Sequence, residues 1–149
     1  DDCVVEGTVR TFTNEVLELI EQRMQTIAEA TCAAFEAQCE FEFRRQYPAT
    51  VNHVAETDFA RRVLGEVVGA KNVLDFRPTM GAEDFSYFLQ AIPGCYFLIG
   101  NGDGEHREGG HGLGPCMLHN PSYDFNDDLI PLGATAWVRM AEKWLASAR

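Results

Sequence analysis

The sequence predicts an α/β fold, α+β overall, in which helices alternate with short strands. Residues 3–12 alternate between apolar and polar side chains, which is typical of a half-buried strand. Residues 14–38 carry apolar side chains at three- and four-residue steps, which indicates one face of a long helix. Beyond residue 52, helical patterns and short apolar runs follow one another, as in a layer of helices on a sheet.

The first fifty residues predict a strand, a helix and a second strand. Thr13 suits the N-cap of the helix, and Glu15 suits its first turn. Residues 40–44 alternate again, with Phe41 and Phe43 on one face. Because a two-stranded sheet under one helix buries little apolar surface, we expect half of a ferredoxin-like split β-α-β unit. The other half would lie upstream, in a longer chain.

An extended segment separates these elements from the rest of the chain. Pro48 disfavours a helical conformation at Tyr47, and we interpret residues 47–52 as a linker. We therefore expect residues 1–48 to belong to one domain and residues 49–149 to belong to another.

The part after the linker predicts three helices and two short strands. The first helix ends at Gly69, and a short strand follows at residues 73–74. An aromatic-rich helix covers residues 84–91, and the apolar run 95–99 is typical of a strand buried on both faces. The last helix follows residues 126–128, and its apolar ridge consists of Leu132, Ala136, Met140 and Trp144.

The composition excludes several classes of partner. The chain has 149 residues, of which 46% are hydrophobic, and a net charge of -11. An acidic chain does not favour nucleic acid or an anionic membrane surface, and no apolar stretch is long enough for a transmembrane helix. The five cysteines have irregular spacings and form no CxxC pair, so we expect free thiols and a cytoplasmic location.

His119 is the strongest candidate for metal chemistry. Imidazole is a common metal ligand, and a carboxylate often fixes its ring orientation, which Asp124 or Asp127 could do here. His106 and His111 share no helix face and are weaker candidates. The alternative interpretation is a solvated, glycine-rich surface loop without a ligand.

A second candidate is the turn that contains Gly81, Glu83 and Asp84. Backbone N–H groups near Gly81 could hold a substrate carboxylate or an oxyanion, although helix capping by the two acids explains the same pattern. Arg10 could anchor a carboxylate with two hydrogen bonds, or it could be a solvated strand residue. Cys95 is best explained as inert core.

Five sequence blocks resemble one known family when they are taken in order. The blocks are Gly7–Phe12, Tyr47-Pro48 with Asn52, Met80–Ser86, Pro93-Gly94 with Ile99-Gly100, and Leu118–Pro121 with Tyr123–Asp127. Over essentially all 149 residues, the chain resembles the C-terminal part of the hippurate hydrolase and N-acyl-amino-acid amidohydrolase branch of the aminoacylase-carboxypeptidase metallopeptidase family.

The resemblance implies a di-zinc peptidase-like α/β catalytic domain that is interrupted by a ferredoxin-like lid. Residues 1–48 would be the second half of this lid and dimerisation domain, and residues 49–149 the C-terminal part of the catalytic domain. The family hydrolyses the amide bond of N-acyl amino acids or peptides with two divalent ions, zinc or manganese, and a glutamate as general base. A homodimer through the lid is the expected assembly.

Only one of the family's metal ligands has a match in this sequence, and the match is His119. The resemblance therefore implies that the chain alone is inactive and does not retain the two metal ions. Arg10, Gly81, Glu83 and Asp84 would be substrate-binding residues in the longer protein. Two alternatives remain open, namely a non-catalytic dimerisation or binding module and a small protein that binds metal through its loop histidines.

Overall fold

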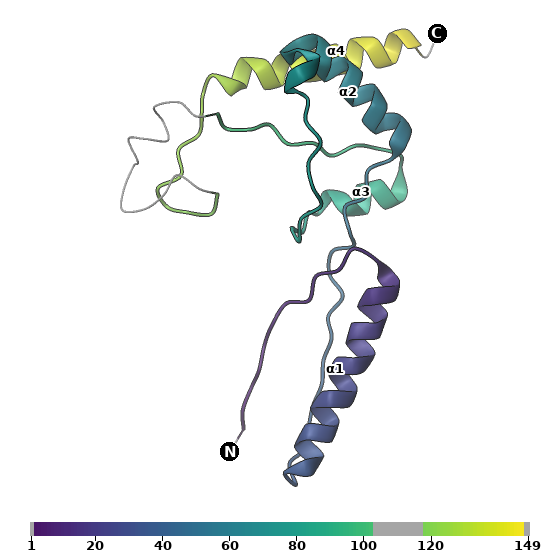
Figure 1. Ribbon diagram of the computed structural model, residues 1–149, viewed down its shortest axis with the longest axis vertical. Helices are drawn as coiled ribbons and strands as arrows, with labels where there is room; N and C mark the ends of the chain where they lie inside the picture. The colour runs from purple at the N-terminus through teal and green to yellow at the C-terminus, as the bar shows by residue number, and fades with distance from the viewer. Residues whose placement is uncertain (1, 103–117, 148–149) are drawn as a thin grey trace. The chain divides into compact units, whose positions relative to one another are not determined.

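The computed structural model describes residues 2–102 and 118–147, and its regular structure within these ranges is helical (Figure 1). No strand is assigned among the described residues. The chain divides into two compact units, of which the first contains Asp1–His53 and Phe76–Cys95 and the second contains Val54–Asp75 and Tyr96–Arg149. The elements are α1 (Asn14–Ala34), α2 (Val54–Val68), the 3-10 helix η1 (Ala70–Asn72), α3 (Phe85–Ala91) and α4 (Leu129–Ser147).

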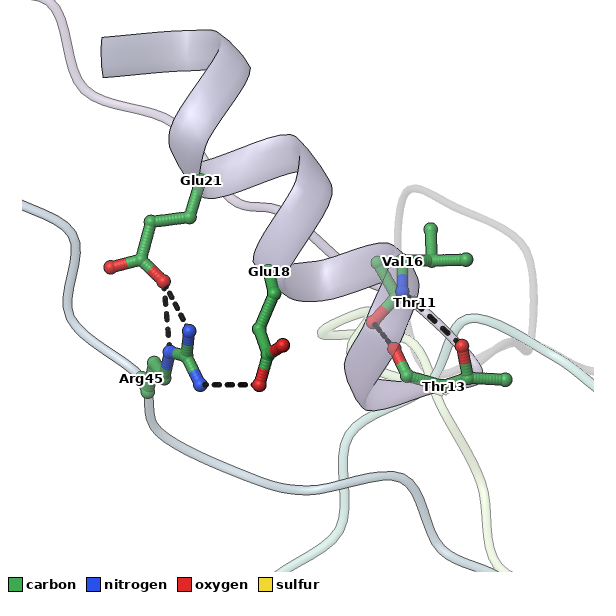
Figure 2. A network of polar contacts seen from close by, with 6 residues as sticks. All are labelled: Thr11, Thr13, Val16, Glu18, Glu21 and Arg45. Atoms are coloured by element: carbon green, nitrogen blue, oxygen red, sulfur yellow. Dashed lines mark hydrogen bonds and ion pairs between the residues drawn. The ribbon is translucent and has the colours of Figure 1, made fainter.

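Helix α1 begins at the N-cap that the sequence predicts. The Thr13 hydroxyl oxygen accepts a hydrogen bond from the Val16 N–H at 3.3 Å, and the Thr11 hydroxyl donates to the Thr13 carbonyl at 3.1 Å (Figure 2). Hydrogen bonds from its own backbone N–H and from Thr13 hold the pKa of Glu15 below its usual value. The first turn of α1 thus has a partner for an N–H group that the helix itself leaves unpaired.

Helix α1 ends at Ala34, earlier than its apolar periodicity predicts. Glu36 has a left-handed φ of 57°, its N–H donates to the Ala33 carbonyl at 3.1 Å, and the Ala37 N–H donates to the Cys32 carbonyl at 2.9 Å. These two bonds form a Schellman motif, which reverses the chain at the end of a helix. Because glycine usually occupies the left-handed position, a glutamate there gives no sequence signal for the helix end.

The chain after α1 runs back along the helix in an extended conformation (Figure 1). Arg45 donates to Glu21 at 2.5 and 2.9 Å and lies 3.9 Å from Glu18, so one guanidinium holds this segment against the helix (Figure 2). Phe41 and Phe43 share a face, with ring centroids 6.4 Å apart, as the alternation predicts.

The segments that the sequence predicts as strands are extended but carry no strand assignment in the described part of the chain. A strand satisfies its N–H and C=O groups by pairing with a neighbouring strand. For the run 95–99, Leu98 is 59% and Ile99 is 43% exposed, so the structure does not cover both of its faces. The α/β layer, the half lid and the domain boundary at residue 48 therefore stay predictions.

The second unit has its buried core between α2 and α4, which cross in contact (Figure 1). Its buried apolar side chains come from both helices and are Ala60, Val63, Ala136 and Met140. At the edge of this contact Phe59 meets Trp144 edge to face, with ring centroids 5.3 Å apart. The Lys143 ammonium donates to the Glu66 carboxylate at 3.0 Å and adds an exposed ion pair between the same helices.

Two sequence predictions in this unit are confirmed. Ala136 and Met140 of the predicted ridge on the last helix are buried, and Trp144 packs on α2. The glycine that the sequence places at the end of α2, Gly69, has a left-handed φ of 85°, which glycine adopts without steric cost. Among the helices described, none has the length and apolar character required to cross a bilayer.

Candidate functional site

His119 lies at the start of a tight turn in the second unit. Its side chain is exposed and its backbone has a left-handed φ of 65°, which is uncommon for a residue other than glycine. A strained backbone at an exposed imidazole persists only where the surrounding contacts hold it. The contacts on its C-terminal side do so.

Asn120 organises the turn directly after His119. Its side-chain oxygen accepts from the Ser122 N–H at 3.0 Å and from the Ser122 hydroxyl at 2.5 Å, and its carbonyl accepts from the Tyr123 N–H at 2.9 Å. An asparagine that binds the backbone two residues on forms an Asx turn. Ser122 is only 2% exposed, so the turn is anchored in the unit while His119 points to solvent.

Asn101 holds the other end of the same loop. Its side-chain N–H donates to the Asp124 carbonyl at 2.9 Å, and its side-chain oxygen accepts from the Asn126 N–H at 3.0 Å. Asn126 returns a bond to the Asn101 carbonyl at 3.2 Å and accepts from the Asp128 N–H at 3.1 Å, just before α4. The segment that carries His119 is therefore fixed between the end of the apolar run 95–99 and α4.

Asn101 and Asn120 are functional candidates that the sequence reasoning does not single out. The Asn120-Pro121-Ser122 sequence is a turn signal that could have indicated Asn120. No comparable signal exists for Asn101, because its partners lie 23 and 25 positions away in the sequence.

Asp124 and Asp127 follow His119 in the same unit. Asp124 is half-buried and contributes its carbonyl to the bond with Asn101, whereas Asp127 is exposed and its carbonyl accepts from the Ile130 N–H at 3.0 Å. These are backbone roles at the entrance to α4. Support of the His119 ring by either carboxylate stays a prediction.

A mostly apolar hollow of about 380 Å³ lies beside the Asn101 bonds. Asn101 and Tyr123 contribute the polar part of its wall, and Ile99, Phe125 and Trp137 contribute apolar surface. Phe97 packs on α4, with its ring centroid 5.6 Å from that of Trp137. A wall of this composition suits an apolar group with one or two hydrogen-bonding atoms.

The predicted turn at Gly81, Glu83 and Asp84 lies in the first unit, and all three residues are exposed. Asp84 occupies the N-cap position of α3 but makes no side-chain capping bond. Instead the buried Ser86 hydroxyl donates to the Glu83 carbonyl at 2.6 Å. Capping by the Asp84 carboxylate, the alternative explanation for this acid, is therefore not observed.

A second hollow, of about 370 Å³, lies where several of the conspicuous sequence blocks meet in the first unit. Phe12, Asn52, His53 and Ser86 contribute to its wall. His53 is half-buried, its N–H donates to the Gly94 carbonyl at 3.0 Å, and its Nδ1 accepts from the Gly94 N–H at 3.1 Å. The two bonds join the segment after Asn52 to the Pro93-Gly94 block, and residues of three of the blocks share the wall of the hollow.

The remaining site predictions are distributed over both units. Arg10 is exposed in the first unit, whereas His119 belongs to the second. His106 and His111 lie outside the described residues. Within residues 2–102 and 118–147, no group of three or more His, Cys, Asp or Glu side chains is arranged to hold a metal ion.

The donor set can be compared with what a hydrolytic metal site requires. Zinc in such sites takes about three protein ligands and keeps one position for water or substrate. The described residues offer one exposed imidazole, His119, in a fixed turn. They do not form a di-metal centre by themselves, and no reaction step through a metal follows from them.

Comparison with known proteins identifies the family. The model of peptidase family M20/M25/M40 matches residues 2–143, which is nearly the whole chain. The chain belongs to this family. The resemblance that the five sequence blocks indicate is therefore confirmed.

The relatives of this M20/M25/M40 chain are named after several different hydrolytic activities. It is 33% identical over 147 residues to thermostable carboxypeptidase 1 of Saccharolobus solfataricus, which covers 97% of the chain and 35% of the relative. It is 30% identical to IAA-amino acid hydrolase ILR1-like 4 of Arabidopsis thaliana, with 97% and 32% covered. It is 29% identical to hippurate hydrolase of Campylobacter jejuni, with 97% and 35% covered. The chain spans about a third of the length of these curated relatives.

Proposed function

We propose that the protein containing this chain hydrolyses the amide bond of N-acyl amino acids. The observation that carries the proposal is the family match over residues 2–143. The names of two relatives, hippurate hydrolase and IAA-amino acid hydrolase, describe amides between an acyl group and an amino acid. The name of the carboxypeptidase relative suggests a peptide as an alternative substrate, which the same amide hydrolysis would cleave.

His119 is the proposed ligand that this chain contributes. The family chemistry uses two divalent ions, zinc or manganese, which when bound lower the pKa of a water molecule and polarise the amide carbonyl. The Asx turn at Asn120 and the bonds of Asn101 support this role, because they fix the backbone on the C-terminal side of the imidazole. The other ligands and the general base would come from parts of the protein outside this chain.

Arg10, Gly81, Glu83 and Asp84 are the proposed substrate-binding residues. A guanidinium forms paired hydrogen bonds with a carboxylate, so Arg10 suits the free carboxylate of the amino-acid half of the substrate. All four residues are exposed, which is compatible with access of a ligand. Their arrangement around a substrate is an expectation from the family resemblance.

The proposed assembly is a homodimer through the lid, with a cytoplasmic location. The large apolar side chains exposed on α1 support a contact surface there: Val16, Leu19, Met24 and Ile27 are 40–64% exposed. Exposed apolar groups clustered on one element are typical of an interaction surface. The same observation favours the second candidate function, a non-catalytic dimerisation module.

An assay of the whole protein separates the two functions. Hippurate, a series of N-acetyl amino acids and the corresponding amino-acid amides are incubated with enzyme and added zinc or manganese, and release of the free amine is measured. We expect hydrolysis of the compounds with a free carboxylate, and a loss of about tenfold or more when that carboxylate is capped as an amide, because a charged hydrogen bond contributes about 1.5–3 kcal/mol.

Arg10 provides the matched variants for this assay. Arg10→Ala should raise KM for the free carboxylates and leave the capped amides unchanged, whereas Arg10→Lys should restore part of the difference, since lysine keeps the charge without the paired geometry. No hydrolysis of any compound with either metal would contradict the enzymatic proposal and favour the dimerisation module.

A further inference from the structure

Asn101 is followed directly by Gly102, just after the apolar run 95–99. The chain has six asparagines, and Asn101 is the one that precedes a glycine. An asparagine in this position loses its side-chain amide most readily, because glycine has no Cβ to shield the backbone nitrogen that attacks it. Gly102 is exposed and has a left-handed φ of 76°, so water has access to this peptide. The sequence therefore favours a covalent change at Asn101.

The folded structure opposes this change through hydrogen bonds. The Asn101 side-chain N–H donates to the Asp124 carbonyl at 2.9 Å, and its side-chain oxygen accepts from the Asn126 N–H at 3.0 Å. The Asn126 side chain also donates to the Asn101 backbone carbonyl at 3.2 Å. Attack on the amide carbon makes that carbon tetrahedral, so the two bonds of the planar amide cannot both persist. These bonds have to break before the reaction proceeds.

We propose that Asn101 is a deamidation site, which the bonds to Asp124 and Asn126 protect while the segment is folded and which reacts when the segment opens. The Gly102 nitrogen attacks Cγ of Asn101, the new C–N bond closes a succinimide ring, and the Cγ–Nδ2 bond breaks. The proton of the Gly102 N–H leaves with the amide group as ammonia. Water then opens the ring at one of its carbonyls and gives aspartate or isoaspartate, with no change in oxidation state.

Each product weakens the attachment of the segment that follows His119. Aspartate keeps the acceptor for the Asn126 N–H but has lost the donor for the Asp124 carbonyl. Isoaspartate also lengthens the main chain by a methylene group, which displaces the carbonyl that the Asn126 side chain binds. The reaction consumes only water and is independent of the proposed amide hydrolysis by the whole protein.

The test follows the whole protein during incubation in a mildly alkaline buffer, either folded or unfolded in guanidinium chloride. Samples are digested with trypsin at mildly acidic pH, which limits deamidation during the work-up. The peptide 72–107 contains Asn101, and its mass increases when an OH group replaces the amide NH₂. Electron-transfer fragmentation assigns the change to Asn101 or Asn72, the other asparagine of this peptide, and distinguishes isoaspartate from aspartate.

We expect Asn101 to react at least about tenfold more slowly in the folded protein than in guanidinium chloride, because two hydrogen bonds must break. Asn126→Ala removes the bond to the Asn101 carbonyl and should speed the reaction of the folded protein about threefold or more, with no change in guanidinium chloride. Gly102→Ala should slow the reaction in guanidinium chloride, because its Cβ shields the attacking nitrogen.

Asp128→Ala is the matched control for Asn126→Ala. Asp128 is exposed and donates to the Asn126 side chain through its backbone N–H, which the substitution keeps, so both rates should stay unchanged. Equal rates at Asn101 in the folded and the unfolded protein would overturn the proposal. The same conclusion would follow if Asn101 stayed intact in guanidinium chloride, or if folded Asn126→Ala reacted no faster than folded Asp128→Ala.

Discussion

The side-chain amide of Asn101 bonds two backbone groups of the segment after His119, one as donor and one as acceptor. Asn101→Ala removes both bonds and leaves the Asp124 carbonyl and the Asn126 N–H without this partner. Loss of a hydrogen-bond partner destabilises the folded state by about 1–3 kcal/mol when the remaining group is buried. We expect faster amide hydrogen exchange at Asn126. Asn101→Asp is the matched control, because it keeps the acceptor and should have a smaller effect. Unchanged exchange in Asn101→Ala would show that the loop is held elsewhere.

A second residue-scale prediction concerns the N-cap of α1. Thr13→Ala removes the acceptor for the Val16 N–H and a hydrogen bond to Glu15, and should cost about 0.5–2 kcal/mol of helix stability, whereas Thr13→Ser should cost less. Because the pKa of Glu15 is lowered in the folded state, its contribution is present above the usual carboxyl pKa and is lost as pH falls through the lowered value.

An NMR titration of Glu15 checks both parts of this prediction. Its pKa should move up toward the usual carboxyl value in Thr13→Ala, with the first-turn amides of α1 exchanging faster. A Glu15 pKa that is identical in both proteins would rule out the Thr13 hydroxyl as a source of the shift.

The residue-scale features divide by the distance over which they act. The Thr13 N-cap and the left-handed Gly69 depend on neighbours in the sequence, and both are predicted and confirmed. The bonds between His53 and Gly94 and between Asn101 and Asn126 join residues that are distant in the sequence. A sequence pattern contains no direct information on such pairs, so the sequence does not predict the contacts of His53 and Asn101.

At the scale of elements, the contact of α2 with α4 provides the buried core of the second unit. Met140→Ala removes a side chain that is only 9% exposed and should destabilise the unit by about 2–5 kcal/mol. Val138→Ala on the same helix, where the side chain is 56% exposed, should change stability by no more than about 0.5 kcal/mol. Urea denaturation followed by tryptophan fluorescence measures the difference. Equal effects would contradict the observed burial.

Helix positions could be predicted from the sequence because each helix satisfies most of its hydrogen bonds internally. The periodic patterns locate α1, α2, α3 and α4, and the end of α1 is misplaced only because a glutamate occupies the left-handed position at residue 36. Strands depend on a partner for every other backbone group. The strands that the alternation predicts at residues 3–12 and 40–44 therefore stay predictions, because no partner strand is assigned among the described residues.

At the scale of the whole molecule, the exposed apolar side chains of α1 predict self-association. Leu19→Glu and Ile27→Glu place charges at positions that are 54% and 64% exposed, and each should shift the dimer toward monomer because an interface disfavours an unpaired charge. Gln25→Glu, an exposed position that the helical period places away from Leu19 and Ile27 on α1, is the matched control. Sedimentation equilibrium measures the dissociation constants. A constant that is unchanged in both charged variants would place the interface elsewhere.

The central claim is that His119 supplies a metal ligand to an amidohydrolase. The most direct measurement compares the whole protein with its His119→Ala variant for hydrolysis of hippurate and N-acetyl amino acids and for bound zinc and manganese, with circular dichroism as a check on folding. We predict a lower metal content and a loss of more than about 100-fold in kcat/KM. Residues that only hydrogen-bond to metal ligands already change metal affinity or activity about 10–100-fold, and loss of a ligand itself should have a larger effect. A folded His119→Ala protein with unchanged rate and metal content would contradict the account.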